Sequence, residues 1–532
     1  MPGTPDALIA QAAVYYRAGA FDAAAQCGLA IVAQAPEHFD ALHLLGVLCL
    51  NRGQAADAVC YLTRAARLQP DHEQMNVNLG NAWSALKLFP RAEDASRQLV
   101  ATHPHNLDAW NNLGFALGQQ HRDEEAIAVL RTALAYKPDF APASFNMGKS
   151  LTALGRLDEA VAAFRTALRF APPDTSAERI GDIISELGRV LVELDRPEEA
   201  LALLQGELAR HPGLLDLVWN MSLLHLQLGD YTSGWRGYES RWQVKDHDKP
   251  RPDATIPDIA AIAGKRILVT GEQGRGDVIQ FVRYAPLLAE RGASVYLGVY
   301  DDLIPLLSGM PGVARVMGED EQEPAYDIVT PLLSLPLAFG TKVETIPAGV
   351  PYLRADPDRV VKWKLRLGTE RGPRVGLTWS SGNPGATRAT RLEAMRPLLS
   401  CANVSFHALQ KELNSTDLEF LRRGGRVQDH RAALTDYAET AALIEALDLV
   451  VTIDTGVAHL AGALGKPVWI MLPYVAEWRW LRHREDSPWY PTARLFRQAA
   501  PGDWDGLAAR VAVALMERYS LAPIALEPST RA

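Results

Sequence analysis

Residues of three kinds recur along the first half of the chain at a common spacing of 34 residues. Prolines stand at positions 36, 70, 104, 138 and 172, glycines at 46, 80, 114 and 148, and alanines at 24, 58, 92, 126 and 160. Three registers that share one period indicate a repeated structural unit. The small residues let neighbouring helices approach closely, and each proline ends a helix. This period constrains the fold of residues 1–244 more strongly than any other feature of the sequence.

The pattern resembles the tetratricopeptide repeat, in which each unit is a pair of antiparallel helices. The register slips by six residues near positions 173–182, and a last, degenerate unit covers about 215–243, which gives about seven units. We therefore expect residues 1–244 to form an all-α superhelix with a concave groove.

A polar row accompanies the glycines of the repeats. Two residues before a repeat glycine, or at the corresponding place, stand Asn78, Asn112, Asn146 and Asn220. The resemblance implies that this position lines the concave face, where a carboxamide offers one donor and one acceptor to an extended peptide. The alternative is that asparagine is simply common at this repeat position. The row thus leads us to expect a protein or peptide partner.

The periodicity changes after a polar linker at about 245–257. Short apolar runs now alternate with helical stretches, at 266–270, 294–299, 326–329, 374–379, 404–409, 448–453 and 467–472. Strands that alternate with helices predict parallel α/β sheets. A less regular stretch at 354–373 divides the runs into two groups. We expect two Rossmann-like domains that face each other across a cleft, one at 258–355 and one with a C-terminal helix at 373–532.

Small, polar and charged residues follow four of these expected strands. The clusters are GEQGRGD after position 270, SSGNPGATRATR after 379, QKE after 409 and DTGVAH after 453. Ligands of open parallel sheets bind at the carboxyl ends of the strands, so the four clusters should meet in one cleft. This expectation places Gly274, Gly276, Ser380 and Asn383 in loops of the cleft.

The loop GEQGRGDVIQF (271–281) is rich in glycine but matches neither common phosphate motif. Its order is G-x-x-G-x-G rather than G-x-G-x-x-G, and no Gly-Lys-Ser/Thr follows. Asp277 begins a helix, where the helix dipole favours a carboxylate. The acid has two interpretations, a structural acid at the helix start or a base that accepts a proton from a substrate hydroxyl.

The segment DTGVAHLAGALGKP (454–467) ends a buried strand and starts a short helix. The helix N-terminus at Thr455 and Gly456, which follow Asp454, is a ready anion site, and the threonine hydroxyl adds a donor. His459 lies one turn into the helix and is either a structural residue or a donor to phosphate. The cations Arg388, Arg391 and Lys411 stand in the neighbouring clusters.

Two further segments keep two interpretations each. The aromatic residues of 477–498 (Trp478, Trp480, Trp489 and Tyr490) could line a base or sugar pocket or pack against the sheet. Asp436 and Glu439 have the spacing of a capping box, which explains both acids without a ligand.

Composition excludes several classes of function. A net charge of −9 argues against nucleic acid as the main partner. The four cysteines form no CxxC pair, which fits a reducing compartment. No apolar run approaches the roughly 18 residues of a membrane span, and no signal peptide is visible at the N-terminus, so we expect a cytoplasmic location without stable membrane insertion. No metal-binding motif stands in the sequence, and we expect neither a metal nor another cofactor.

The motifs GEQGRGDVIQF, VGLTWSSGN, ALQK, DTGVAHLAGALGKPVWIML and SPWYPTARLFRQ together resemble glycosyltransferase family 9, which includes the bacterial heptosyltransferases. The resemblance is stronger to members that are fused to tetratricopeptide repeats, and the layout is similar to that of protein O-GlcNAc transferases. It implies a GT-B fold and inverting, metal-independent transfer from a nucleotide-diphosphate sugar.

The resemblance also implies roles for residues. Asp277 matches the catalytic base, whereas the donor would be held by Asp454, Thr455, Gly456 and His459, with Gln410, Lys411, Arg388 and Arg391 as further contacts. The family keeps a lysine in a loop that here has threonines and arginines, which argues against an ADP-heptose donor.

The sequence therefore predicts a glycosyltransferase that modifies an acceptor hydroxyl, on a protein presented by the repeat groove. Two alternatives remain open. One is a non-catalytic repeat scaffold with a degenerate nucleotide-sugar-binding domain, and the other is a transferase that acts on lipopolysaccharide or another glycan.

Overall fold

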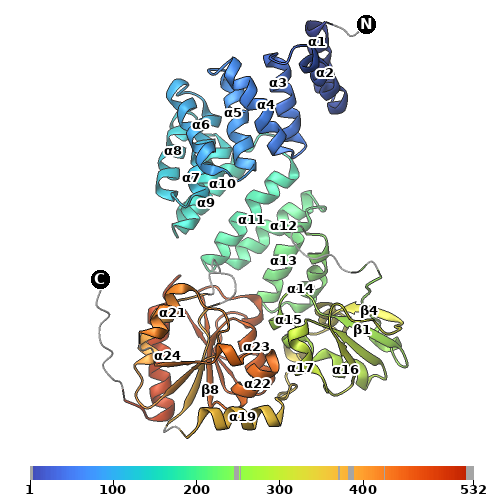
Figure 1. The fold of residues 1–532 in the computed structure, drawn as a ribbon, viewed down its shortest axis with the longest axis vertical. Helices are drawn as coiled ribbons and strands as arrows, with labels where there is room; N and C mark the ends of the chain where they lie inside the picture. Colours follow the sequence, from blue (N-terminus) through green and yellow to red (C-terminus); the bar gives the residue numbers. More distant parts are fainter. Residues whose placement is uncertain are drawn as a thin grey trace. The chain divides into compact units, whose positions relative to one another are not determined.

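The computed structural model describes residues 4–244, 251, 253–369, 372–380, 389–423 and 426–522. The chain divides into two compact units, Met1–Leu214 and Leu215–Ala532. The expected order of an all-α part followed by an α/β part is confirmed (Figure 1). No helix in the described ranges is both long and apolar enough to cross a bilayer.

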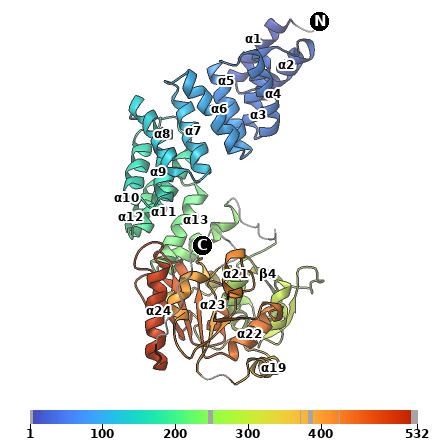
Figure 2. The ribbon, with the colours of Figure 1, turned by 60° about the vertical axis from the view of Figure 1, so that its left-hand side comes forward.

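The first unit consists of helical hairpins, in which each helix packs on the next one along the chain (Figure 2). Its helices are α1 (Pro5–Arg17), α2 (Phe21–Gln34), α3 (Phe39–Asn51), α4 (Ala55–Leu68), α5 (Glu73–Ala85), α6 (Phe89–Thr102), α7 (Leu107–Gln119), α8 (Asp123–Tyr136), α9 (Ala141–Ala153), α10 (Leu157–Arg169), α11 (Ala177–Glu193) and α12 (Pro197–Arg210).

The periodic small residues lie where helices touch. Each alanine of the period is fully or almost fully buried. A Cβ atom added to Gly114 would lie 2.4 Å from Cγ of Leu130, and one added to Gly148 would lie 2.7 Å from the ring of Phe164. Gly80 is different, because its nearest neighbour would be Oγ of Ser96 at 3.6 Å, an ordinary contact. The period therefore marks helix packing, although not every glycine is required by it.

The slip in the repeat register lies at α11. This helix has 17 residues, whereas α3, α5, α7 and α9 have 13 each. Much of the insertion predicted near positions 173–182 thus lengthens the helix.

The second unit begins with a helical hairpin that the sequence groups with the repeats. It comprises α13 (Leu215–Gln227), α14 (Tyr231–Tyr238) and the 3-10 turn η1 (Glu239–Trp242). We call residues 215–242 the last hairpin. A parallel four-stranded sheet follows in the order β3-β2-β1-β4, from β1 (Arg266–Thr270), β2 (Ser294–Gly298), β3 (Val313–Met317) and β4 (Ile328–Pro331). Its helices include α15 (Arg275–Phe281), α16 (Tyr284–Glu290), α17 (Ile304–Leu307) and α18 (Leu335–Ala338).

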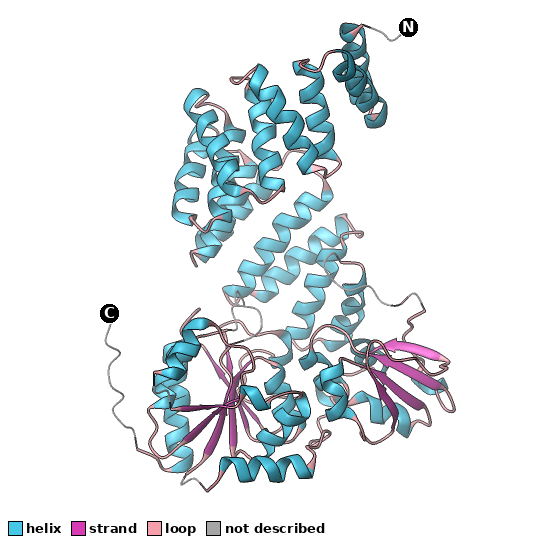
Figure 3. Cartoon of the chain, viewed as in Figure 1, coloured by secondary structure: helices cyan, strands magenta, loops and turns pink. Residues whose placement is uncertain are grey.

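A second parallel sheet has six strands in the order β10-β9-β8-β5-β6-β7 (Figure 3). The strands are β5 (Arg374–Leu377), β6 (Ser405–Ala408), β7 (Val427–Asp429), β8 (Leu449–Ile453), β9 (Val468–Leu472) and β10 (Ala493–Arg497). The helices are α19 (Pro357–Leu367), α20 (Arg396–Leu399), α21 (Ser415–Arg422), α22 (Tyr437–Glu445), α23 (Gly456–Ala463) and α24 (Trp504–Tyr519). Two parallel sheets with helices confirm the expected pair of Rossmann-like domains.

One apolar core joins the parts of the second unit. It runs from Trp235 of the last hairpin through Ile267 of β1 and Phe281 of α15 to Ala461 of α23. A separate core packs the second sheet against α24. The two Rossmann-like domains and the last hairpin therefore form a continuous body around the place where the strand-end clusters meet.

Candidate active site

Loops from both Rossmann-like domains line a cavity of about 770 Å³. They follow β1, β2, β5, β6, β8 and β9 and include the N-terminus of α22. The cavity brings together most of the residues predicted for the site, namely Gly274, Gly276, Asp277, Ser380, Gln410, Lys411, Asp454, Thr455, Gly456 and His459. Such a volume is typical of a small-molecule site.

Asp277 has the structural role expected of an acid at a helix start. Its Oδ2 accepts the backbone N–H of Gly274, the N-cap residue of α15, over 2.9 Å. Its Oδ1 accepts a short hydrogen bond from Arg479. The carboxylate is therefore fixed at the edge of the cavity, with one oxygen on the helix cap and the other on a guanidinium.

Arg479 is the main cavity residue that the sequence analysis did not select. It lies after β9 and is 3% exposed. It pairs with Glu477 over 2.6 Å and donates to Oε1 of Gln280 over 2.8 Å. Burial acts against its charge, but Glu477 and Asp277 outweigh this effect and raise the pKa of Arg479 above its ordinary value. The arginine stays charged and forms an ion pair with Asp277.

The N-terminal turn of α23 forms another wall of the cavity. The preceding strand β8 is buried along its whole length, and Asp454 at its end is 3% exposed. The side chain of Thr455, the N-cap residue, does not cap the helix, and its hydroxyl lies 3.2 Å from that of Thr452. Thr455, Gly456 and Val457 all line the cavity, and the anion-binding role of this helix start stays a prediction.

The two glycine-containing motifs touch each other. A Cβ atom on Gly276 would lie 3.0 Å from Cδ2 of His459 and 3.2 Å from Cα of Gly456. Glycine at 276 therefore lets α15 approach the start of α23, a role that the sequence analysis did not foresee. Gly274 lines the cavity more openly, because its Cβ would meet only the carboxylate of Asp277, at 3.1 Å.

His459 has partners that fix its ring. Its Nδ1 lies 2.9 Å from the hydroxyl of Tyr490, and its ring stacks on Trp480 at 5.4 Å. The side chain is buried yet belongs to the cavity wall. The geometry thus supports the structural interpretation of His459, whose side chain also forms part of the cavity wall.

Three predicted contacts come from the loops after β5 and β6. Oε1 of Gln410 accepts the backbone N–H of Ser380 over 3.1 Å, so Gln410 holds the loop that leaves β5. Lys411 is exposed and donates to the carbonyl of Thr435 over 3.4 Å. Arg391 is exposed and does not belong to the cavity wall as described. Asn383 and Arg388 lie outside the described residues.

Tyr437 is a second cavity residue missed from the sequence. It begins α22, and burial raises its pKa to about 12. A Cβ atom on Gly456 would lie 3.2 Å from its hydroxyl. Tyr437 is therefore a neutral donor beside the start of α23 at physiological pH.

Comparisons with known proteins find matching segments in both units. Tetratricopeptide repeat models match residues 9–73, 43–106 and 119–179. The model of glycosyltransferase family 9 (heptosyltransferase) matches residues 428–471, which run from β7 to β9 and include DTGVAH. The chain thus has segments similar to tetratricopeptide repeats in its first unit and a segment similar to family 9 glycosyltransferases in its second.

Several relatives share parts of this layout. Protein FlbA of Caulobacter vibrioides is 29% identical over 517 residues, which cover 90% of this chain and 84% of FlbA. A peroxisomal targeting signal receptor of Kluyveromyces lactis is 33% identical over 85 residues, or 16% of this chain and 15% of the receptor. A tetratricopeptide repeat protein of Parabacteroides merdae is 14% identical, with a TM-score of 0.38, and covers 44% of this chain and 91% of its own.

Three asparagines of the row form hydrogen bonds with the preceding repeat. Nδ2 of Asn112 donates to Asn81 over 2.8 Å, and Nδ2 of Asn146 donates to Asn111 over 2.8 Å. Nδ2 of Asn78 lies 2.9 Å from Nε2 of His43. Asn78, Asn112 and Asn146 are half-buried, and Asn220 lies in α13 of the second unit. The row links successive repeats, and its peptide-binding role stays a prediction.

The aromatic segment of the transferase domain packs rather than lines the cavity. All four predicted aromatic residues are buried. Trp478 and Trp489 pack against the last hairpin, whereas Trp480 and Tyr490 contact His459 of the cavity wall. Trp478 meets Trp235 edge to face at 5.2 Å, and Nε1 of Trp489 donates to the hydroxyl of Tyr231 over 3.2 Å.

The expected capping box at α22 is half right. Oδ1 of Asp436 accepts the N–H of Glu439 over 2.7 Å, as predicted for an N-cap. The Glu439 carboxylate is instead bound by Arg359 at 3.0 Å and by Nε1 of Trp363 at 2.7 Å, both on α19.

Within the described ranges, no three His, Cys, Asp or Glu side chains form a group able to hold a metal ion.

Proposed function

We propose that the second unit transfers a sugar from a nucleotide-diphosphate sugar to an acceptor hydroxyl, with inversion and without a metal ion. The observation that carries the proposal is the shared cavity of Asp277 and the N-terminal turn of α23. Glycosyl transfer needs a carboxylate for the acceptor proton and fixed positive donors for the leaving diphosphate, and this cavity offers both. The family 9 match over 428–471 supports the same reaction class.

In the proposed reaction, the acceptor oxygen attacks the anomeric carbon while its proton passes to Asp277. The bond between that carbon and the diphosphate oxygen breaks, and the electron pair stays on the diphosphate. The N–H groups of Gly456 and Val457 and the hydroxyl of Thr455 stabilise the new charge, with Lys411 at the rim. Arg479 holds the carboxylate of Asp277 at the edge of the cavity.

We further propose that the acceptor is a protein or peptide held by the tetratricopeptide repeats, and that the enzyme works in the cytoplasm. The half-buried asparagine row supports the first point, because carboxamides bind extended backbone. The 85-residue match to a receptor named for a targeting signal supports it as well. The four free cysteines favour a reducing compartment.

The decisive test replaces the carboxylate without removing the helix cap. Asp277→Asn keeps an oxygen for the N–H of Gly274 but removes the base, so we expect kcat for transfer to fall by roughly 10² to 10⁴. Transfer from a panel of labelled nucleotide sugars to lysate proteins measures it. Asp356→Asn, at the N-cap of α19 and outside the cavity, is the matched control. Wild-type turnover in Asp277→Asn would remove the base assignment, and label in glycolipid would change the acceptor class.

A second candidate function is nucleotide-sugar binding without transfer. It is favoured by the finding that both oxygens of Asp277 already have partners, namely Arg479 and the N–H of Gly274. Calorimetric titration with nucleoside diphosphates separates the two functions. Tight binding with no turnover on any donor of the panel would favour the binding protein.

A further inference from the structure

The loop before Asp277 has a backbone that its own sequence does not stabilise. Gln273 has a φ of 60°, in the left-handed region that costs a residue other than glycine about 1 kcal/mol or more. Its neighbour Glu272 is 9% exposed and places a carboxylate in the interior. Both features persist only where surrounding groups hold them, and several of those groups lie on the last hairpin.

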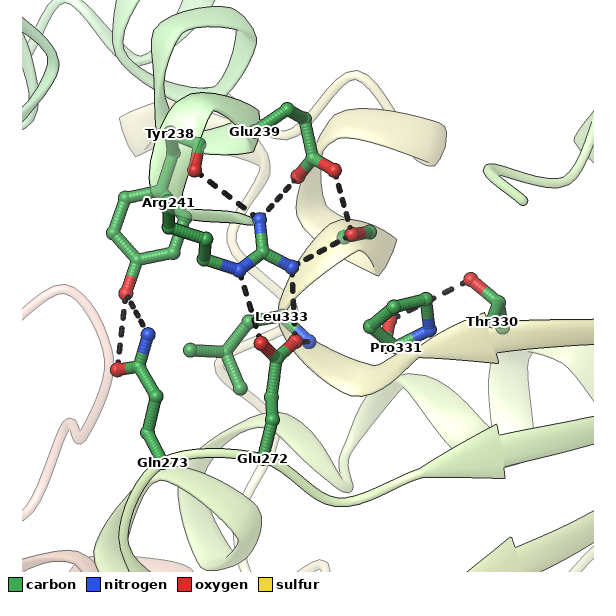
Figure 4. Close-up of polar contacts among 9 residues, drawn as sticks. Tyr238, Glu239, Arg241, Glu272, Gln273, Thr330, Pro331 and Leu333 are labelled. Atoms are coloured by element: carbon green, nitrogen blue, oxygen red, sulfur yellow. Dashed lines mark hydrogen bonds and ion pairs between the residues drawn. The ribbon is translucent and has the colours of Figure 1, made fainter. Parts of the chain in front are cut away.

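Arg241 of η1 binds Glu272 through two parallel hydrogen bonds. Nε and Nη2 of Arg241 donate to the two carboxylate oxygens, each over 2.9 Å (Figure 4). Arg241 is 1% exposed and also donates to Oγ of Ser334 over 2.8 Å. Oε1 of Glu272 accepts in addition the N–H of Leu333 over 2.9 Å, and Glu239 pairs with the same guanidinium at 2.7 Å. The network therefore ties the last hairpin, the loop after β1 and the turn after β4.

A second contact holds the next residue of the loop. The hydroxyl of Tyr238, on α14, lies 3.2 Å from Oε1 and 3.1 Å from Nε2 of Gln273. The carbonyl of Gln273 accepts a hydrogen bond from the hydroxyl of Tyr300. The strained residue is thus held through its side chain by the last hairpin and through its backbone by the loop after β2.

The last hairpin also holds the segment that carries Arg479. Nε2 of Gln227 donates to the carbonyl of Ala476 over 3.0 Å, with both groups buried. The ring of Trp478 packs against Tyr238 at 6.1 Å as well as against Trp235. The same hairpin therefore contacts the two segments whose side chains, Asp277 and Arg479, pair in the cavity.

We propose that the last hairpin is a positioning element of the transfer reaction, with Arg241 and Tyr238 as positioning residues that hold the loop 272–274 so that Asp277 faces the acceptor. This inference rests on the proposed function. A buried ion pair often contributes no more stability than apolar residues of the same size, so its use here is orientation. A carboxylate displaced by about 1 Å loses much of its rate advantage while donor binding at α23 is unaffected.

Two conservative substitutions test the proposal on the full chain. Arg241→Lys keeps the charge but loses the two-pronged geometry, and Tyr238→Phe removes only the hydroxyl that contacts Gln273. Tyr284→Phe is the matched control, because this equally buried tyrosine donates or accepts a single bond with Thr341 at 2.8 Å, away from the loop. We expect kcat to fall at least tenfold in Arg241→Lys and about threefold in Tyr238→Phe, with an unchanged KM for the donor.

Hydrogen exchange of the amides at 271–277 gives a readout that does not need activity. The proposal requires faster exchange in both variants than in wild type and Tyr284→Phe. Wild-type kcat and wild-type exchange in a folded Tyr238→Phe overturn it, even if Arg241→Lys does not fold. A wild-type protein without transfer activity defeats the proposed function instead, and the exchange data then still decide whether the last hairpin holds the loop.

Discussion

In both units, glycine lets two helices pack closely. The residues that it contacts are near in the sequence in the first unit and far away in the second. In the repeats, Gly148 admits Phe164 of the following helix. In the second unit, Gly276 admits Gly456 and His459, from the other Rossmann-like domain. Contacts of a repeat array are local, so a substitution there should act locally. The contacts of Gly276 lie in the wall of the cavity, so a comparable substitution there should reduce both the stability of the second unit and ligand binding.

The largest effect is expected at the contact between the two glycine motifs. Gly276→Ala forces a methyl group against His459 and Gly456, and we expect the free energy of unfolding of the second unit to fall by about 2 to 3 kcal/mol. Binding of a nucleoside diphosphate should weaken at least tenfold. Denaturant unfolding, followed through the buried tryptophans, and calorimetric titration measure the two effects.

Gly274→Ala is the control for this comparison, because its Cβ meets only the carboxylate of Asp277. It should lose clearly less stability than Gly276→Ala. Equal and small effects of both substitutions would show that the contact is loose and that the comparison with the repeats fails.

The next largest effect concerns pH and the second unit alone. Burial, followed by His430 and Arg374, lowers the pKa of His407 from 6.5 to about 4. Between these values the unfolded chain binds more protons than the folded one, so the free energy of unfolding decreases as the pH falls through this window. From pH 7 to pH 5 the loss should be about 2 kcal/mol.

Unfolding curves across this range measure the slope, and His407→Gln should flatten it. His105→Gln replaces an exposed histidine of the first unit and should leave it unchanged. A slope that persists in His407→Gln would mean that other groups carry the pH dependence.

A smaller effect is expected for glycine within the repeats. Gly148→Ala brings a methyl group against the ring of Phe164 and should destabilise α9 and α10 by about 1 to 2 kcal/mol. Gly80→Ala makes only ordinary contacts and should stabilise α5 by about 0.5 to 1 kcal/mol. Hydrogen exchange of the helices reports both changes.

Donor hydrolysis, which needs only the second unit, should not change in either variant. If Gly148→Ala lowers it, the first unit acts on the site and the local character of the repeats is refuted.

The smallest effect on stability should come from the asparagine row. Asn112→Ala with Asn146→Ala removes one hydrogen bond between units at each place, about 1 kcal/mol each at most. The KM for a protein acceptor should nevertheless rise several-fold, whereas the KM for the donor stays the same. Gln98→Ala, exposed on α6, is the control. An unchanged acceptor KM would restrict the row to linking the repeats.

Much of the fold could be predicted from the sequence because its signals are local. The seven apolar runs all became strands, and 266–270 matches β1 residue for residue. Three strands were missed. β3 and β7 have exposed or half-buried residues along most of their length, and β10 lies in a segment dominated by its arginines and aromatic rings. Their apolar pattern is weak, because a strand at the edge of a sheet is covered on fewer sides.

The candidate site was predicted in part, for a physical reason. Asp277 and the DTGVAH segment follow buried strands, and the ends of such strands can be located from the sequence alone. Arg479 and Tyr437 follow no strand directly, and only the folding of distant segments brings them to the cavity. The same holds for the aromatic residues of 477–498, whose partners lie on the last hairpin or at His459.

The sequence by itself determined the repeat period, the two parallel sheets and the clusters of polar residues at their edges, because each depends on spacing along the chain. Only the tertiary structure decided that Gly276 is a contact between helices, that Asp277 is held by Arg479, and that the last hairpin supports their loops. These are contacts between residues far apart in sequence, and no local pattern specifies which distant side chain will fill a given space.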